Sequence, residues 1–157
     1  MRLWRLAAAG LFAIGVILSS LVPARAQDTQ RPGLVGTWRV LFERPPGPPG
    51  NAIVTFTSDG TSVRTTDRSP MTSPSHGVWK QINEREFMAS WIAFQFDEKG
   101  AWIGNQKASF IVRLGSDLDN FTGDAEGTNM ALDGSVTGKI IGPFKGTRVM
   151  LESYVPK

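Results

Sequence analysis

The chain has 157 residues, a formal net charge of +3, one histidine and no cysteine, and this length suits a single domain. The lack of cysteine excludes disulfides, thiolate nucleophiles and zinc–thiolate sites. One histidine cannot build a multi-histidine metal centre, and no cofactor-binding motif is present, so we predict neither a cofactor nor a bound metal.

The first 26 residues are predicted to be a secretory signal peptide. Arg2 and Arg5 give a basic start, residues 6–18 are uncharged and mostly apolar, and Ala24-Arg25-Ala26 is a small-x-small cleavage site. Cleavage after Ala26 removes three basic residues and no acidic one, which leaves 14 of each sign. This balance argues against a nucleic-acid partner. We therefore predict a periplasmic or secreted protein with no stable membrane span after cleavage, although an uncleaved segment would anchor it.

Residues 27–33 are predicted to be a flexible leader, and residues 34–157 one domain of short strands separated by turns. Apolar and polar residues alternate within the strands, and turn signals such as Asp59-Gly60 separate them. No segment has the 3.6-residue period of an amphipathic helix. The expected strands cover residues 36–43, 52–57, 61–68, 77–82, 86–96, 102–114, 120–129, 138–141 and 144–151.

Eight or nine strands joined by tight sequential turns predict an all-β fold, a single antiparallel up-and-down barrel. Closure of the barrel removes exposed strand edges, which are prone to aggregate. An immunoglobulin-like sandwich is the alternative, but it requires longer crossover connections. The proline-rich segment 45–50 cannot enter a central strand and is expected to form a loop at the barrel mouth.

Two short motifs resemble those of lipocalins and other calycins. Gly36-Thr37-Trp38 is similar to the Gly-x-Trp that opens the first strand of those barrels, and Gly146-Thr147-Arg148 stands where a last-strand arginine is expected. The resemblance implies that Trp38 plugs the closed end and that Arg148 stacks on its indole. Residues 55–61 and 76–80 are similar to small exported bacterial lipocalin-like proteins. The allene oxide cyclase-like barrel is a near relative in architecture.

The resemblance implies a barrel that binds a small apolar molecule in its interior. Strand alternation places Val40 and Phe42 on the inner face with Trp38, and we expect Trp91 to face inward because burial of an indole gains more than burial of Ser90. The predicted ligand-binding residues are Phe42, Phe56, His76, Trp79 and Trp91, beneath a rim formed by residues 44–51. The same aromatic side chains could instead fill a solid barrel that serves as an interaction domain.

The sequence leaves open whether the protein is an enzyme, and it favours binding. No nucleophile motif is present. His76 is the one weak candidate for a catalytic residue, because its unperturbed pKa lies near neutrality. The alternative function is that of a cofactor-independent cyclase or isomerase that holds its substrate in the cavity. An inward-pointing His76 or Lys107 would favour that alternative.

Acidic residues are dense between positions 117 and 126, and their oxygen atoms suit calcium. The twelve-residue spacing of a calcium-binding loop is absent, so we interpret Asp117, Asp119, Asp124 and Glu126 as solvated side chains. The sequence does not indicate an oligomeric state.

Overall fold

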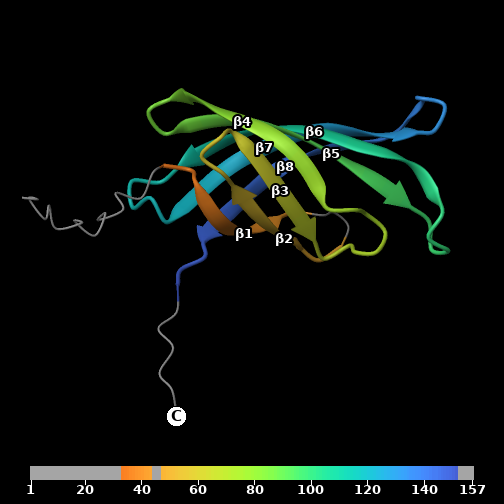
Figure 1. Ribbon diagram of the computed structural model, residues 1–157, viewed down its shortest axis with the longest axis horizontal. Coiled ribbons are helices and arrows are strands. Elements are labelled where there is room, and N and C mark those ends of the chain that lie inside the picture. Colours follow the sequence, from red (N-terminus) through yellow and green to blue (C-terminus); the bar gives the residue numbers. More distant parts are fainter. Residues whose placement is uncertain (1–32, 44–46, 152–157) are drawn as a thin grey trace, which may run out of the picture. The chain divides into compact units, whose positions relative to one another are not determined.

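The computed structural model describes residues 33–43 and 47–151, which form a closed barrel of eight antiparallel strands (Figure 1). Each strand pairs with the next one in the chain, and the first strand pairs with the last. The predicted all-β up-and-down barrel is therefore confirmed. The strands are β1 (Gly36–Phe42), β2 (Gly50–Phe56), β3 (Thr61–Thr66), β4 (Ser75–Asn83), β5 (Glu86–Phe96), β6 (Trp102–Leu114), β7 (Asn120–Ala131) and β8 (Val136–Arg148).

Several predicted segments lie outside the described residues. These are the signal peptide, residues 27–32 of the leader, residues 44–46 of the proline-rich loop and residues 152–157. No helix within the described ranges is long and apolar enough to span a bilayer.

The barrel interior is built by the two-residue period of the strands. In β5, Phe87, Ala89 and Trp91 are buried, whereas Met88 and Ile92 are exposed. Successive side chains of a strand point to opposite faces, so every second residue enters the core. The core cluster contains Leu34, Trp38, Val40, Ala52, Val54, Phe56, Phe87, Ala89, Trp91, Ala108, Phe110, Val112, Leu114, Phe121 and Phe144.

The last strand differs from the sequence prediction. Residues 138–141 and 144–151 were expected to form two strands, but β8 runs without a break from Val136 to Arg148. The ladder between β1 and β8 ends at the pair Phe42–Phe144. Pro143 therefore lies where β8 pairs with β7 on one side only, a position in which a missing N–H need not cost a ladder hydrogen bond.

The two ends of the barrel differ because of this register. At one end, β1 begins beside the end of β8, and the turns at residues 57–60, 84–85 and 115–119 lie close to it. At the other end, residues 136–143 of β8 pair with β7 but not with β1. We call these the closed end and the open end.

Candidate functional site

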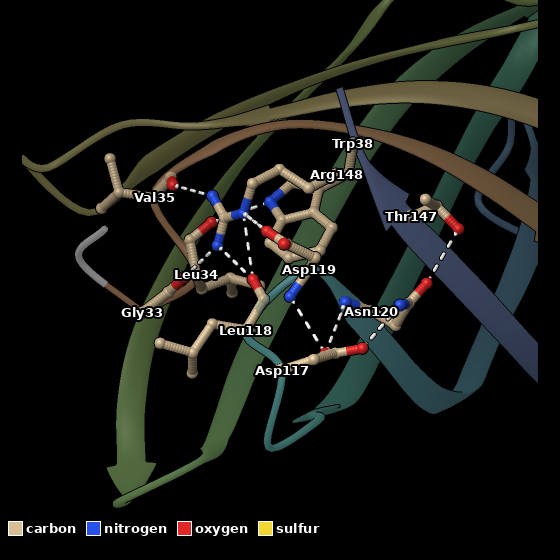
Figure 2. Close-up of polar contacts among 10 residues, drawn as sticks. All are labelled: Gly33, Leu34, Val35, Trp38, Asp117, Leu118, Asp119, Asn120, Thr147 and Arg148. Atoms are coloured by element: carbon tan, nitrogen blue, oxygen red, sulfur yellow. Dashed lines mark hydrogen bonds and ion pairs between the residues drawn. The ribbon is translucent and has the colours of Figure 1, made fainter. Parts of the chain in front are cut away.

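Trp38 fills the closed end of the barrel. Its side chain is fully buried, its Nε1 donates a 2.9 Å hydrogen bond to the carbonyl of Leu34, and its ring packs on Phe121. The guanidinium of Arg148 lies over the indole, 4.2 Å from the ring centroid (Figure 2). The two residues that the resemblance to calycins singled out therefore lie in contact.

Arg148 is held by backbone oxygens as well as by the ring. Figure 2 shows its guanidinium at the centre of four hydrogen bonds of 2.7–3.0 Å to the carbonyls of Gly33, Val35 and Leu118. An ion pair of 3.4 Å joins its Nε to Asp119. Gly36 allows this approach, because a Cβ there would lie 2.7 Å from Nη1 of Arg148 and its φ of +131° is rare for other residues.

The turn at residues 115–119 presents one of these carbonyls. Leu118 has a φ of 59°, which is uncommon outside glycine. Asp117 stabilises the turn by accepting hydrogen bonds from the backbone N–H groups of Asp119 and Asn120 and from the Asn120 side chain (Figure 2). The Asn120 side-chain bond and these N–H groups hold the pKa of Asp117 below its usual value.

Three of the four acidic residues considered for calcium have separate partners, and the fourth, Glu126, is exposed. Asp117 caps its own turn, Asp119 pairs with Arg148, and Asp124 forms a 2.6 Å ion pair with Arg113. The part of the chain that the structure describes contains no group of three or more side chains suited to a metal ion.

Between the closed and open ends lies a cavity of about 360 Å³, within the range of small-molecule sites. Its apolar wall includes Val40, Phe42, Trp91, Phe110, Ile140 and Phe144. The aromatic rings continue to the closed end: Phe110 contacts Trp91 and Phe144, at centroid distances of 4.0 and 5.8 Å, and Phe144 contacts Phe121. The apolar wall of the cavity is thus part of the barrel core.

Two small residues, Ser62 of β3 and Gly77 of β4, fix the position of the Trp91 ring. Its Nε1 donates a 3.0 Å hydrogen bond to Oγ of Ser62, and both side chains are buried. Its ring lies against Gly77, where a Cβ would come within 2.0 Å of the indole. A side chain larger than hydrogen at position 77 would therefore displace the ring from the cavity wall.

The cavity also has a polar wall, centred on Arg64 of β3. The Arg64 guanidinium lies 4.8 Å from the ring centroid of Trp91, and its Nη2 donates a 3.2 Å hydrogen bond to Oε1 of Gln106. Gln106 in turn donates to Oδ1 of Asn129, at 3.1 Å. These three residues come from β3, β6 and β7, and all of them line the cavity.

The charge of Arg64 is poorly compensated. Its Nε is buried without a hydrogen-bond partner, and no described acidic residue forms an ion pair with it, although Glu43 lines the same cavity. Burial lowers the pKa of Arg64 to about 10, because desolvation disfavours the charged form. The guanidinium is therefore still protonated at neutral pH.

Of the five predicted ligand-binding residues, two line the cavity and three lie elsewhere. Phe42 and Trp91 line the cavity. Phe56 and Trp79 instead contact each other edge to face below it, and Trp79 also contacts Phe87. His76 is exposed and pairs in register with Val63 and Ile92, which are exposed too. Of the predicted rim, residues 44–46 lie outside the described part and residues 47–51 are not among those that line the cavity, although the adjacent Glu43 is.

Sequence reasoning missed Arg64, Gln106 and Asn129. In β3 the inward residues are polar and the apolar Val63 is exposed, so the usual rule that apolar residues face inward fails there. A usable signal was the Asp59-Gly60 hairpin. Its register pairs Val54 with Arg64, and directly paired residues share one face of the sheet.

Comparison with protein-family models, with curated proteins and with solved structures yields no match for this chain. The case for a function therefore rests on the cavity and its walls.

Proposed function

We propose that this protein is an exported, lipocalin-like barrel that binds a small, largely apolar molecule in its interior. The observation that carries the proposal is the cavity of about 360 Å³, which has aromatic walls and lies above a filled closed end. Export is inferred from the signal-peptide pattern of residues 1–26, which predicts a periplasmic or secreted protein.

The geometry favours a binding pocket over a channel. Trp38 and Arg148 fill the closed end. Toward the open end, the ladder between β1 and β8 stops at the pair Phe42–Phe144. A ligand would enter and leave through the open end. Aromatic rings are typical of the walls of small-molecule sites, and here they share the cavity with eight polar or charged side chains among the described lining residues.

Binding is preferred to catalysis because of where two side chains lie. An inward His76 or Lys107 would have favoured a cyclase or isomerase, but both residues are exposed on the outer face. Among the described residues, the ionisable ones on the cavity wall are Glu43, Arg64, Arg68 and Lys139.

The proposal can be tested with N-phenyl-1-naphthylamine, a neutral apolar dye whose fluorescence rises in a dry environment. We expect a saturable rise with the mature protein. Ala125→Phe, which fills the cavity from β7, should abolish the rise. The matched control Glu126→Phe places the same side chain on the outer face and should retain it.

A second readout does not depend on filling the cavity. Trp91→Phe should remove the ligand-induced change in intrinsic tryptophan fluorescence, whereas Trp102→Phe, at a half-exposed site, should leave it. Absence of saturable dye binding, or unchanged binding by Ala125→Phe, would overturn the proposal. If the dye binds as expected, mass spectrometry of organic extracts from protein purified from its own host identifies the natural ligand.

A further inference from the structure

The position of Arg64 inside the barrel lowers the stability of the fold, because its guanidinium loses contact with water and gains few hydrogen bonds. A guanidinium has five N–H donors, and within the described structure only the bond to Gln106 uses one of them. Burial of a charge without a partner destabilises a protein unless something compensates it. An arginine in this position therefore favours an anionic partner. Glu43 lines the same cavity, but no described acidic residue forms an ion pair with Arg64.

The charges around the cavity have the same sign as Arg64. Among the described residues that line it, Arg64, Arg68 and Lys139 are basic and Glu43 alone is acidic, which leaves an excess of two positive charges. The predicted mature chain has equal numbers of basic and acidic residues. The positive charge is thus concentrated at the cavity, where low-dielectric walls strengthen its effect on an anion.

The polar and apolar parts of the cavity lie on different strands. Arg64, Gln106 and Asn129 come from β3, β6 and β7, whereas Phe42, Ile140 and Phe144 come from β1 and β8. A molecule that satisfies both parts needs an anionic group at one end and an apolar body at the other.

We propose that the ligand is an amphipathic carboxylate whose head group accepts hydrogen bonds from Arg64 and whose apolar body packs against Phe42, Phe110 and Phe144. This inference rests on the proposed function, because it names the ligand class of the same cavity. A guanidinium can bind a carboxylate or a phosphate through two oxygens. A carboxylate is preferred because its single negative charge matches that of Arg64, the one part-buried cation among the described lining residues, whereas Arg68 and Lys139 are exposed. Gln106 holds Nη2 and thereby orients the guanidinium.

Isothermal titration calorimetry with decanoate, 1-decanol and decyl phosphate tests this inference, because the three probes share one chain and differ in the head group. We expect the wild-type protein to bind decanoate about 10- to 100-fold more tightly than 1-decanol, the range of one hydrogen-bonded charge pair. Arg64→Met should lose this preference and still bind 1-decanol. The matched control is Arg39→Met, at an exposed position of β1, and it should keep the preference.

The outcomes separate this inference from the proposed function. Equal affinity for decanoate and 1-decanol, or an unchanged preference in Arg64→Met, would overturn the carboxylate while apolar binding stands. Binding of the naphthylamine without binding of decanoate would likewise overturn the carboxylate inference and leave the proposed apolar binding intact. Tighter binding of decyl phosphate than of decanoate would replace the carboxylate by a phosphate. Failure of all probes, the naphthylamine included, would overturn the proposed function itself.

Folding of the variants is checked by far-UV circular dichroism. If Arg64→Met does not fold, Arg64→Gln removes the charge and keeps a hydrogen-bonding group, and the same loss of preference is expected from it. Arg64→Lys keeps the charge without the planar fork, so its preference for decanoate should be intermediate.

Discussion

The described part of the barrel interior contains two stacks of an arginine on a tryptophan. At the closed end, Arg148 lies 4.2 Å from the ring centroid of Trp38, and in the cavity Arg64 lies 4.8 Å from that of Trp91. Arg148 makes four hydrogen bonds to carbonyls and an ion pair with Asp119. Arg64 makes one hydrogen bond, to Gln106, and its Nε has no partner. The two stacks thus share a geometry and differ in the number of hydrogen bonds and in compensation of the charge.

This is the difference we expect between an arginine that stabilises the fold and one that binds the proposed ligand. A buried charge with a full set of partners holds its surroundings together, and its removal leaves those partners unsatisfied. A buried charge with few partners costs stability in the free protein, a cost that proteins tolerate at binding sites. We therefore expect the two stacks to respond in opposite ways to the same substitution.

The largest effect is expected from the tryptophan at the closed end. Trp38→Ala should lower the free energy of unfolding by about 3–5 kcal/mol, because it removes a fully buried indole and leaves a cavity. Urea denaturation of the mature protein measures the change. Trp102→Ala, at a half-exposed position, is the control and should cost far less. Equal losses in both variants would contradict the role of Trp38 as the main packing residue of this end.

The next effect is that of the structural arginine. Arg148→Met should lower the free energy of unfolding by about 3 kcal/mol, because the carbonyls of Gly33, Val35 and Leu118 lose a charged donor. Urea denaturation again gives the value. A loss below about 0.5 kcal/mol, the range of surface substitutions, would show that the hydrogen bonds at the closed end do not hold the barrel.

The same substitution in the cavity should have the opposite sign. Arg64→Met removes a poorly compensated charge and keeps most of the side-chain volume, so it should raise the free energy of unfolding of the ligand-free protein by about 1 kcal/mol. The measurement must use delipidated protein, because a bound ligand stabilises the wild type. A destabilisation as large as that of Arg148→Met would remove the distinction between the two stacks.

The smallest effect concerns pH. Burial lowers the pKa of Arg64 in the folded protein to about 10, whereas the unfolded chain keeps the higher pKa of a solvated guanidinium. Because the unfolded chain binds more protons between these values, the contribution of Arg64 to stability rises with pH in that window and is unfavourable below it. Binding of decanoate requires the charged form, so wild-type affinity should fall above about pH 10.

Titration calorimetry at pH 7, 9 and 10.5 tests this dependence. Glu43, Arg68 and Lys139 also line the cavity, so Arg64→Met, which retains all three, is the reference for each pH. A profile that is the same in the wild type and in this variant would show that Arg64 does not govern binding.

Much of the fold could be predicted from the sequence, because in most strands the alternation of apolar and polar residues and the turn residues at the ends indicate the same boundaries. Alternation in β5 and the Asp59-Gly60 turn mark strands and hairpins without reference to the rest of the chain. The pair Trp38 and Arg148 was reached through the resemblance of two short motifs, and the barrel register brings them together. The single strand β8 was missed, because Gly142-Pro143 is tolerated only where one side of the strand is unpaired.

The polar wall of the cavity could not be predicted from alternation. The outer face carries apolar residues such as Val63, Val78 and Ile92, so the hydrophobic pattern does not tell which face of β3 or β4 points inward. His76 lies on the outer face beside these residues, and Arg64 points inward from the same pair of strands. The strand register decides between the two faces. For β3 the Asp59-Gly60 hairpin indicates this register, because it pairs Arg64 with the buried Val54.

The most direct test of the central claim is a crystal structure of the mature protein with decanoate. We predict the carboxylate within hydrogen-bond distance of the Arg64 guanidinium, with Gln106 still bound to Nη2 and the alkyl chain against Phe110 and Phe144. A chain that lies in the cavity with its carboxylate at the open end, beside Arg68 or Lys139 and away from Arg64, would contradict the claim.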